Sequence, residues 1–223
     1  MQDWKVELHC HTAASGDSLV KVKDLIRTAK KRGLDRLAIT DHNTIRGAIF
    51  AQSIDPDLII VGEEILTTKG ELLAFFVKEE IPRGLAPMDA IEKLKKQEAF
   101  ISVSHPFDRF RHGWALADLK LITPYIDAIE IFNARSFTPS INQLAKEYAQ
   151  EHHLLGTVGS DAHLLYEVGR SSQSIKAFTD SESLRSSLKN THTNEVYSSP
   201  FVRFGSTYAK IMKQLFGKNR FSI

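Results

Sequence analysis

The pair His9 and His11 near the start of the chain has the residue types and the spacing of a metal site. Alternate side chains of a β-strand point to the same face, so both imidazoles can approach one ion while Cys10 points away. Imidazole is the commonest metal ligand in proteins. Two strand histidines alone are equally compatible with ordinary polar residues near a surface, so the interpretation depends on what recurs downstream.

Polar residues, most of them able to bind metals, follow the apolar runs that we predict to be strands. They are, in chain order, Asp41 and His42, Glu63 and Glu64, His105, Asn133 and Arg135, and Asp161 and His163. The carboxyl ends of parallel strands and the loops behind them converge on one crevice, where α/β folds build active sites. Imidazoles and carboxylates gathered there predict a site for divalent ions.

The elements that must position these residues alternate between two patterns. Runs rich in Ile, Val, Leu and Phe predict strands at residues 4–8, 37–40, 58–61, 72–77, 100–104, 128–132 and 154–158. Helical spacing predicts helices at 22–29 before Gly33, at 88–94 behind Pro87, at 140–148, near 184–188, and at 208–216 before Gly217. This alternation predicts an α/β fold with a mostly parallel sheet, open or closed into a barrel.

The composition favours a globular protein of the cytoplasm. With 223 residues, 42% of them hydrophobic and 25% charged, one domain can bury a substantial core. No apolar run approaches the roughly 20 residues of a membrane-spanning helix, and the first residues lack the features of a secretory signal, so we expect no membrane partner. A single cysteine cannot form an intrachain disulfide, which agrees with a reducing compartment.

The formal net charge of +2 is too small to indicate a nucleic-acid-binding protein, but the charges are unevenly distributed. No acidic residue occurs after Glu195. The basic residues beyond it are Arg203, Lys210, Lys213, Lys218 and Arg220. We therefore expect a basic helical extension from about residue 203, which either meets an anionic partner or is only a solvated helix face.

Taken together, the motifs resemble the PHP superfamily, named for polymerase and histidinol phosphatase. The motifs are His9-x-His11, Asp17, Ile39-Thr40-Asp41-His42, Gly62-Glu63-Glu64, Ser104-His105-Pro106 and Gly159-Ser160-Asp161-Ala162-His163. Their order is kept from about residue 6 to about residue 170. The resemblance implies that residues 1–223 form a single PHP-type phosphoesterase domain. It also implies a distorted (β/α)7 barrel, with two or three divalent ions at the carboxyl ends of the strands.

The resemblance also implies how the ligands are shared among the ions. The first ion would be held by His9, His11, Glu64 and Asp161, the second by Glu64 and His105, and the third by Asp17, His42 and His163. Mn, Zn and Fe all suit such a mixed set of imidazoles and carboxylates. Asp41 is interpreted as a partner that orients a histidine, and Glu63 is expected on the opposite face of its strand.

One position departs from the family pattern. Members usually place a histidine near the strand after the glutamate motif, whereas this chain has Lys69-Gly70-Glu71 there. Glu71 is a plausible substitute because carboxylates bind Mn²⁺ and Fe as well as imidazole does, and Zn²⁺ only somewhat less well. The alternative is a solvated glutamate at the start of a strand, and the sequence leaves both open.

Phosphate recognition also needs cations that do not bind metal, and the planar fork of arginine suits it. Arg135 after the sixth strand is the first candidate and Arg170 the second, each with an ordinary surface arginine as its alternative. The leading hypothesis is a metal-dependent phosphoesterase that hydrolyses a small phosphorylated metabolite or a nucleotide by attack of metal-bound hydroxide, with Asp161 and Arg135 as catalytic residues.

Two other hypotheses remain. The first is a nuclease that trims short oligonucleotides, prompted by the basic extension and by a loop in which aromatic residues neighbour arginines, namely Arg109, Phe110, Arg111 and Trp114. The second is a non-catalytic module that metal ions merely stabilise. The near-complete set of candidate ligands favours catalysis over this second hypothesis.

Overall fold

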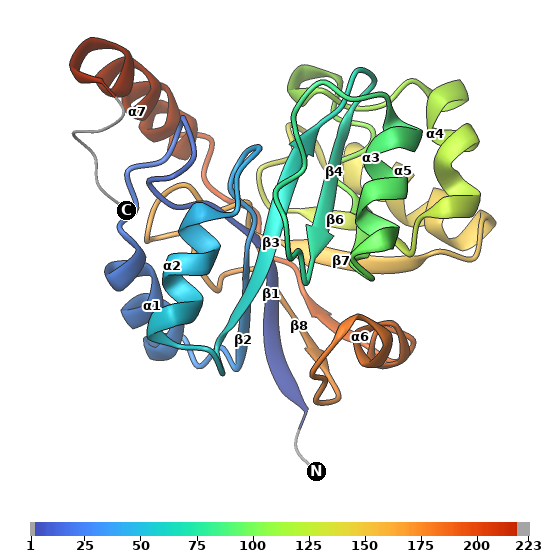
Figure 1. The fold of residues 1–223 in the computed structure, drawn as a ribbon, viewed down its shortest axis with the longest axis horizontal. Coiled ribbons are helices and arrows are strands. Elements are labelled where there is room, and N and C mark those ends of the chain that lie inside the picture. Colours follow the sequence, from blue (N-terminus) through green and yellow to red (C-terminus); the bar gives the residue numbers. More distant parts are fainter. Residues whose placement is uncertain (1–2, 218–223) are drawn as a thin grey trace.

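Nine strands form one curled sheet in residues 3–217, the part of the chain that this computed structural model describes (Figure 1). Their order across the sheet is β7-β6-β5-β4-β3-β2-β1-β8-β9. The strands are β1 (Trp4–Cys10), β2 (Arg36–Ile39), β3 (Ile59–Leu66), β4 (Glu71–Phe75), β5 (Phe100–Val103), β6 (Ala128–Asn133), β7 (Leu155–Gly159), β8 (Ser172–Ile175) and β9 (His192–Asn194).

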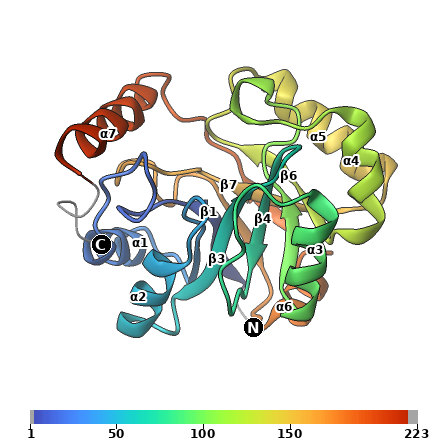
Figure 2. The ribbon, with the colours of Figure 1, turned by 45° about the horizontal axis from the view of Figure 1, so that its top comes forward.

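Helices cover the outside of the sheet, α1 and α2 on one side and α3, α4 and α5 on the other (Figure 2). The helices are α1 (Val22–Lys31), α2 (Arg46–Ile54), α3 (Pro87–Lys96), α4 (Leu116–Ile122), α5 (Pro139–Glu151), α6 (Ser181–Ser187) and α7 (Val202–Phe216), with 3₁₀ turns at Arg109–Arg111 and Thr123–Tyr125. Across residues 3–217, none of these helices combines the length and the apolar character needed to span a bilayer.

The sheet closes into a nearly complete barrel because β1 also meets the segment that follows β7. Asp161 donates its backbone N–H to the His9 carbonyl at 2.9 Å, and His11 donates to the Ala162 carbonyl at 2.9 Å. Cys10 and Ala162 thereby pair in parallel. The first and the last of the sequence motifs become neighbours, and the predicted α/β barrel is confirmed.

The sheet is mixed rather than mostly parallel. β1, β2 and β3 pair in parallel, as do β5, β6 and β7, but β4 runs antiparallel to both β3 and β5. The link from β3 to β4 is a tight turn in which Leu66 pairs with Glu71, too short for the crossover that parallel strands need. β3 also extends past its predicted end, so Glu63 and Glu64 lie within it.

The predicted helices occur, and four further elements were missed. In α1 the predicted face of Val22, Leu25, Ile26 and Ala29 is buried, and Gly33 follows it at a φ of +68°. The missed elements are α2, α4, β8 and β9. α7 starts at Val202 rather than at 208, so it carries an additional turn and a half near the site.

Candidate metal centre

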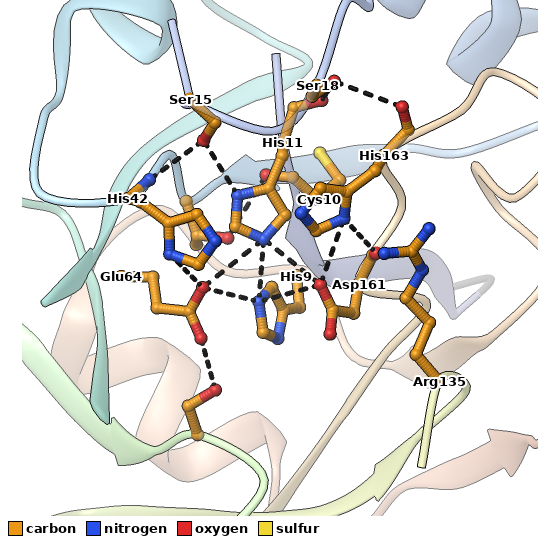
Figure 3. A network of polar contacts seen from close by, with 12 residues as sticks. His9, Cys10, His11, Ser15, Ser18, His42, Glu64, Arg135, Asp161 and His163 are labelled. Atoms are coloured by element: carbon orange, nitrogen blue, oxygen red, sulfur yellow. Dashed lines mark hydrogen bonds and ion pairs between the residues drawn. The ribbon is translucent and has the colours of Figure 1, made fainter. Parts of the chain in front are cut away.

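The nine predicted metal ligands lie together at one end of the barrel. They are His9 in β1, His11 and Asp17 after it, His42 after β2, Glu64 in β3, Glu71 at the start of β4, His105 after β5, and Asp161 and His163 after β7. Figure 3 shows six of them, from four separate segments, directing their polar atoms at a common space. The barrel closure described above is what brings these distant segments together.

The Glu64 carboxylate is at the centre of the cluster. Its Oε2 lies 3.0 Å from His42 Nδ1 and 3.4 Å from Nε2 of both His9 and His11. Asp161 Oδ1 approaches the same space, 3.2 Å from His11 Nε2 and 3.7 Å from His9 Nε2. The two oxygens and the imidazole nitrogens therefore surround a position that a cation could occupy.

Two further groups extend the cluster on either side of Glu64. His105 Nε2 lies 3.2 Å from Glu64 Oε1 and 3.5 Å from Glu71 Oε2. Glu71 is only 5% exposed, so it is not a solvated strand-start residue. On the other side, Asp17 lies 3.2 Å from His163 Nε2 and 3.4 Å from His42 Nε2. Glu64 thus lies between these two groups, within the cluster that could hold metal ions.

Outer hydrogen-bond acceptors orient three of the histidines. His9 Nδ1 lies 2.8 Å from Glu130 Oε1, and His163 Nδ1 lies 2.8 Å from the Asp161 carbonyl. Because these partners can only accept, each ring carries a proton on Nδ1, which leaves Nε2 as the atom that would bind a metal.

The third of these histidines is oriented through an intermediate hydroxyl. His11 Nδ1 lies 3.1 Å from Ser15 Oγ, which donates to Asp41 Oδ1 at 2.9 Å. The Ser15 proton is thereby used, so Oγ accepts from the His11 ring and leaves His11 Nε2 bare. Asp41 therefore orients a histidine, as the sequence suggested, but indirectly.

The donor set fits divalent cations. Asp17 Oδ1 and Glu64 Oε2 are buried yet accept no hydrogen bond of good geometry within the described residues. Burial lowers the pKa of His11 to about 3, helped by His163 and His42, which keeps this ring neutral as a metal ligand must be. Burial and the adjacent Glu64 charge raise the pKa of Glu71 to about 7. Bound cations would supply the counter-charge that these carboxylates lack.

The backbone at Asp161 adopts the left-handed conformation, with a φ of +52°. A non-glycine residue rarely does so, and such positions concentrate at functional sites. The hydrogen bond from Asp161 N to the His9 carbonyl holds the turn. It directs Oδ1 toward the histidines while Oδ2 accepts from Arg111.

Arg135 lines the crevice, so its role in substrate binding stays a prediction, but its guanidinium is largely engaged within its own chain. Its Nε and Nη2 donate to the two Glu167 oxygens at 2.8 and 3.1 Å, and its Nη1 donates to Ser206 Oγ. Its Nη2 also reaches the Val202 carbonyl. The guanidinium therefore forms a buried ion pair with Glu167 and holds the start of α7 in place.

Arg111 is the guanidinium beside the ligands. Its Nη1 donates to Asp161 Oδ2, its Nη2 donates to Asn133 Oδ1 at 3.1 Å, and its Nε donates to Asp108 Oδ2 at 2.9 Å. Sequence reasoning assigned Arg111 only to an oligonucleotide-binding loop. Its position soon after His105 was the available signal. Arg170, the second candidate, stacks on Tyr166 and is not among the residues that line the crevice in the described chain.

Sequence reasoning also missed Glu130 and Glu7. Both carboxylates are fully buried inside strands that are otherwise largely apolar, and that contrast was the signal that could have found them. Glu7 accepts from Ser160 and from the Gly169 backbone, and burial raises the pKa of Glu7 to about 8. Glu63, expected on the opposite face from Glu64, indeed accepts from Ile81 N away from the cluster.

A crevice of about 550 Å³ opens over the cluster. Besides seven of the predicted ligands, its lining includes cationic and aromatic side chains, namely Arg83, Phe110, Arg111, His112, Arg135, Phe137, Arg203 and Lys210. α7 forms one wall, so the basic extension is not simply a solvated helix. Lys218 and Arg220, the last two of its predicted basic residues, lie outside the described residues.

Comparisons with known proteins identify relatives of this chain. The family model named PHP domain matches residues 7–163, and a PHP-associated model matches residues 139–193. Uncharacterized protein MJ1587 of Methanocaldococcus jannaschii is 35% identical over 154 residues, 63% of this chain and 88% of that protein. MJ0417 of the same organism is 35% identical over 170 residues, 74% of this chain and 68% of that protein. A probable phosphatase of Caldicellulosiruptor bescii matches over 61 residues at 34% identity, covering 27% and 25% of the two chains.

Solved structures share the fold. PsfC from Pseudomonas syringae PB-5123 superposes with a TM-score of 0.70 at 19% identity, over 95% of this chain and all of that one. A two-domain protein of Bacteroides vulgatus, described as containing a predicted PHP-like metal-dependent phosphoesterase, superposes with a TM-score of 0.71 at 20% identity, over 86% of this chain and 65% of that one. The lesion-specific endonuclease PfuEndoQ of Pyrococcus furiosus superposes with a TM-score of 0.62 at 16% identity, over 85% of this chain and 57% of that one.

Proposed function

The chain belongs to the PHP domain family, and from this premise we propose that it is a metal-dependent phosphoesterase acting on a small phosphorylated metabolite or a nucleotide. The observation that carries the proposal is the Glu64 carboxylate, whose Oε2 is surrounded at 3.0–3.4 Å by nitrogens of three histidines. The proposed ligands are the nine residues of the cluster. The ions would be two or three of Mn, Zn or Fe.

Divalent ions held there would activate a water near neutral pH and would neutralise the phosphoryl oxygens. The protein contributes the positioning. Glu130 and Ser15 keep bare imidazole nitrogens aimed inward from His9 and His11. Arg111 holds one oxygen of Asp161, which leaves the other directed at the histidines. In this proposal Asp161 binds metal directly, Arg111 positions Asp161, and both Arg111 and Arg135 line the crevice that would receive the phosphate.

The charge of the crevice supports an anionic substrate. Arg83, Arg111, Arg203 and Lys210 line it together with His112. Cations concentrated in a concave, partly buried surface focus a positive potential and attract phosphate groups. Lys210 Nζ also lies 3.5 Å from Asp17 Oδ2, so it stands at the edge of the ligand cluster. A phosphate over the cluster would therefore meet both metal and organic cations.

The test is hydrolysis by the full chain after loading with Mn²⁺, Zn²⁺ or Fe²⁺, on a panel of phosphomonoesters, phosphodiesters and nucleotides. We expect two to three ions per chain by elemental analysis and phosphate release that Asp161→Asn abolishes. Asp89→Asn, an exposed carboxyl in the first turn of α3, is the matched control and should keep full turnover. If Asp161→Asn changes only the melting temperature, the protein is a metal-stabilised module instead.

A nuclease is a second candidate, favoured by the aromatic residues at the mouth of the crevice. Phe110 is 80% exposed, and its ring lies 4.9 Å from that of Phe137. The Arg203 guanidinium lies 3.6 Å from the Phe137 ring centre. Exposed rings beside cations stack bases and hold backbone phosphates. Phe110→Ala should then reduce cleavage of a short single-stranded oligonucleotide about tenfold or more while sparing a small aryl phosphate. Equal effects on both substrates would exclude the nuclease.

A further inference from the structure

α7 carries an exposed apolar stripe on the face that points away from the barrel. The stripe consists of Phe201, which caps the helix, and Phe204, Tyr208, Ile211 and Leu215. Each of these residues is between 48% and 76% exposed. At about 100° per residue they fall within an arc of about 80°. Figures 1 and 2 show α7 at the periphery, with no other labelled helix against this outer side.

The opposite side of α7 packs against the rest of the chain, and the basic side chains of the helix lie on that side. Arg203 donates to the Arg135 carbonyl at 2.7 Å, and Lys213 donates to the Ala13 carbonyl at 2.6 Å. Lys210 faces Asp17, as described above. The residues that flank the stripe within the described helix are uncharged, namely Gly205, Thr207, Met212 and Gln214. The stripe is therefore apolar along its length and free of charge at its edges.

From this arrangement we propose that the stripe is a homodimer interface, in which the α7 helices of two copies pack against each other. Residues 201, 204, 208, 211 and 215 alternate spacings of three and four, the a and d pattern of paired helices. In a twofold dimer the same patch meets itself, so a stripe of this kind is its own complement. The proposal does not depend on the proposed function.

The exposed area of the stripe is comparable with the area that a stable dimer buries. Large apolar side chains present about 150–250 Å² each, so the five partly exposed residues leave on the order of 500–800 Å² uncovered per chain. That reaches or exceeds the largest apolar patch of a typical monomer, about 300–600 Å². Two copies would bury on the order of 1,000–1,600 Å², which overlaps the range of about 1,200–2,000 Å² for stable complexes.

The charge pattern favours a second copy over a membrane surface. Helices that lie on bilayers carry lysine and arginine along the polar face, where these side chains meet anionic headgroups. In α7 the described cations lie on the crevice side and the packed side of the helix rather than at the edges of the stripe, so a bilayer that took the stripe would meet no cation beside it. The same placement removes like-charge repulsion from an α7–α7 contact. Because Arg203, Ser206, Thr207 and Lys210 of α7 also line the crevice, the dimer would hold one wall of that crevice in place.

The first test is the mass of the full chain in solution, by sedimentation equilibrium at micromolar concentration. We expect twice the monomer mass for the native chain and the monomer mass for Tyr208→Glu, with a dimer dissociation constant about 30-fold or more higher. Leu121→Glu is the matched control, because Leu121 is a 69% exposed leucine on α4 and should leave the dimer intact. A native monomer, or a Tyr208→Glu chain that stays dimeric, would overturn the proposal.

A disulfide trap provides a second test that does not depend on destabilising the chain. Residue 208 lies at the middle of the stripe, so it faces its own copy whether the helices pair parallel or antiparallel. Cys10, the single native cysteine, is buried. Mild oxidation should therefore cross-link Tyr208→Cys but not Leu121→Cys. Equal cross-linking of the two variants would refute the interface, and binding of a monomeric chain to phosphatidylserine vesicles would identify a membrane as the occupant instead.

Discussion

Replacement of Glu130 by glutamine should weaken metal binding although Glu130 is not a proposed ligand. Its Oε1 lies 2.8 Å from His9 Nδ1, and its Oε2 accepts from His105 N at 2.9 Å and from Asn133 Nδ2 at 3.0 Å. A glutamine has one acceptor oxygen and one donor amide group in the place of two acceptors. If the oxygen keeps the two donors on its side, the amide group must face His9 Nδ1.

That arrangement reverses the His9 tautomer. His9 Nδ1 would have to accept a hydrogen bond from the amide, so the ring proton would move to Nε2 and point into the cluster. The His9 ring could then bind an ion only after breaking the new hydrogen bond. Loss of such an outer partner commonly costs 10–100-fold in metal affinity, about 1.4–2.7 kcal/mol.

The assay is competition between the protein and a chelator of known Zn²⁺ or Mn²⁺ affinity, read as free metal. Glu151→Gln, at the exposed end of α5, is the matched control and should bind metal as the native chain does. Circular dichroism establishes that both variants are folded. If Glu130→Gln binds metal within twofold of the native chain while remaining folded, the tautomer argument is wrong.

Three further predictions concern the closure of the barrel beside Gly159, the ion pair between Arg135 and Glu167, and the proposed metal ions. Gly159→Ala would place a Cβ 2.3 Å from His9 Cβ, so both the metal affinity and the melting temperature should fall. Gly16→Ala is the control, because Gly16 has open space around it and its replacement should change the melting temperature little. Glu167→Gln should lower the free energy of unfolding, measured in urea, by about 3–5 kcal/mol, because it leaves the buried Arg135 without its ion-pair partner. A decrease below about 1 kcal/mol would contradict the anchoring role of this ion pair. Chelation should lower the melting temperature, since clustered carboxylates lose their counter-charge, and added Mn²⁺ or Zn²⁺ should restore it; an unchanged melting curve would argue against bound ions.

Elements with strong periodic patterns were predictable from the sequence. α1 was one, because its apolar residues recur at helical spacing and a glycine follows at a left-handed position. β8 was missed since Ser172–Ile175 is a short, polar strand whose residues are ordered by pairing with β1. α2 was missed because its large apolar residues do not mark the buried face: Gly47, Ala48 and Ala51 are buried, whereas Ile49, Phe50 and Ile54 are exposed. Such elements exist through tertiary contacts rather than local propensity.

The chemistry of the candidate ligands could be inferred from the sequence alone, because the ability to bind metal belongs to each imidazole or carboxylate. The sequence also placed them after strands, where a barrel gathers loops at one end. The assignment of Glu71 could not be decided there, since a ligand and a solvated glutamate look the same in sequence. Its burial against His105 and Glu64 depends on the antiparallel turn between β3 and β4.

The roles of the arginines were decided only by the tertiary structure. The role of an arginine depends on the groups that its guanidinium contacts, and here those groups are remote in sequence. Glu167 is 32 residues from Arg135, and Asp161 is 50 residues from Arg111. Closure of β1 against the segment after β7 fixes which carboxylates come near which cations. Residue types thus determined which chemistry this protein could do, while chain packing determined which side chains are free to do it.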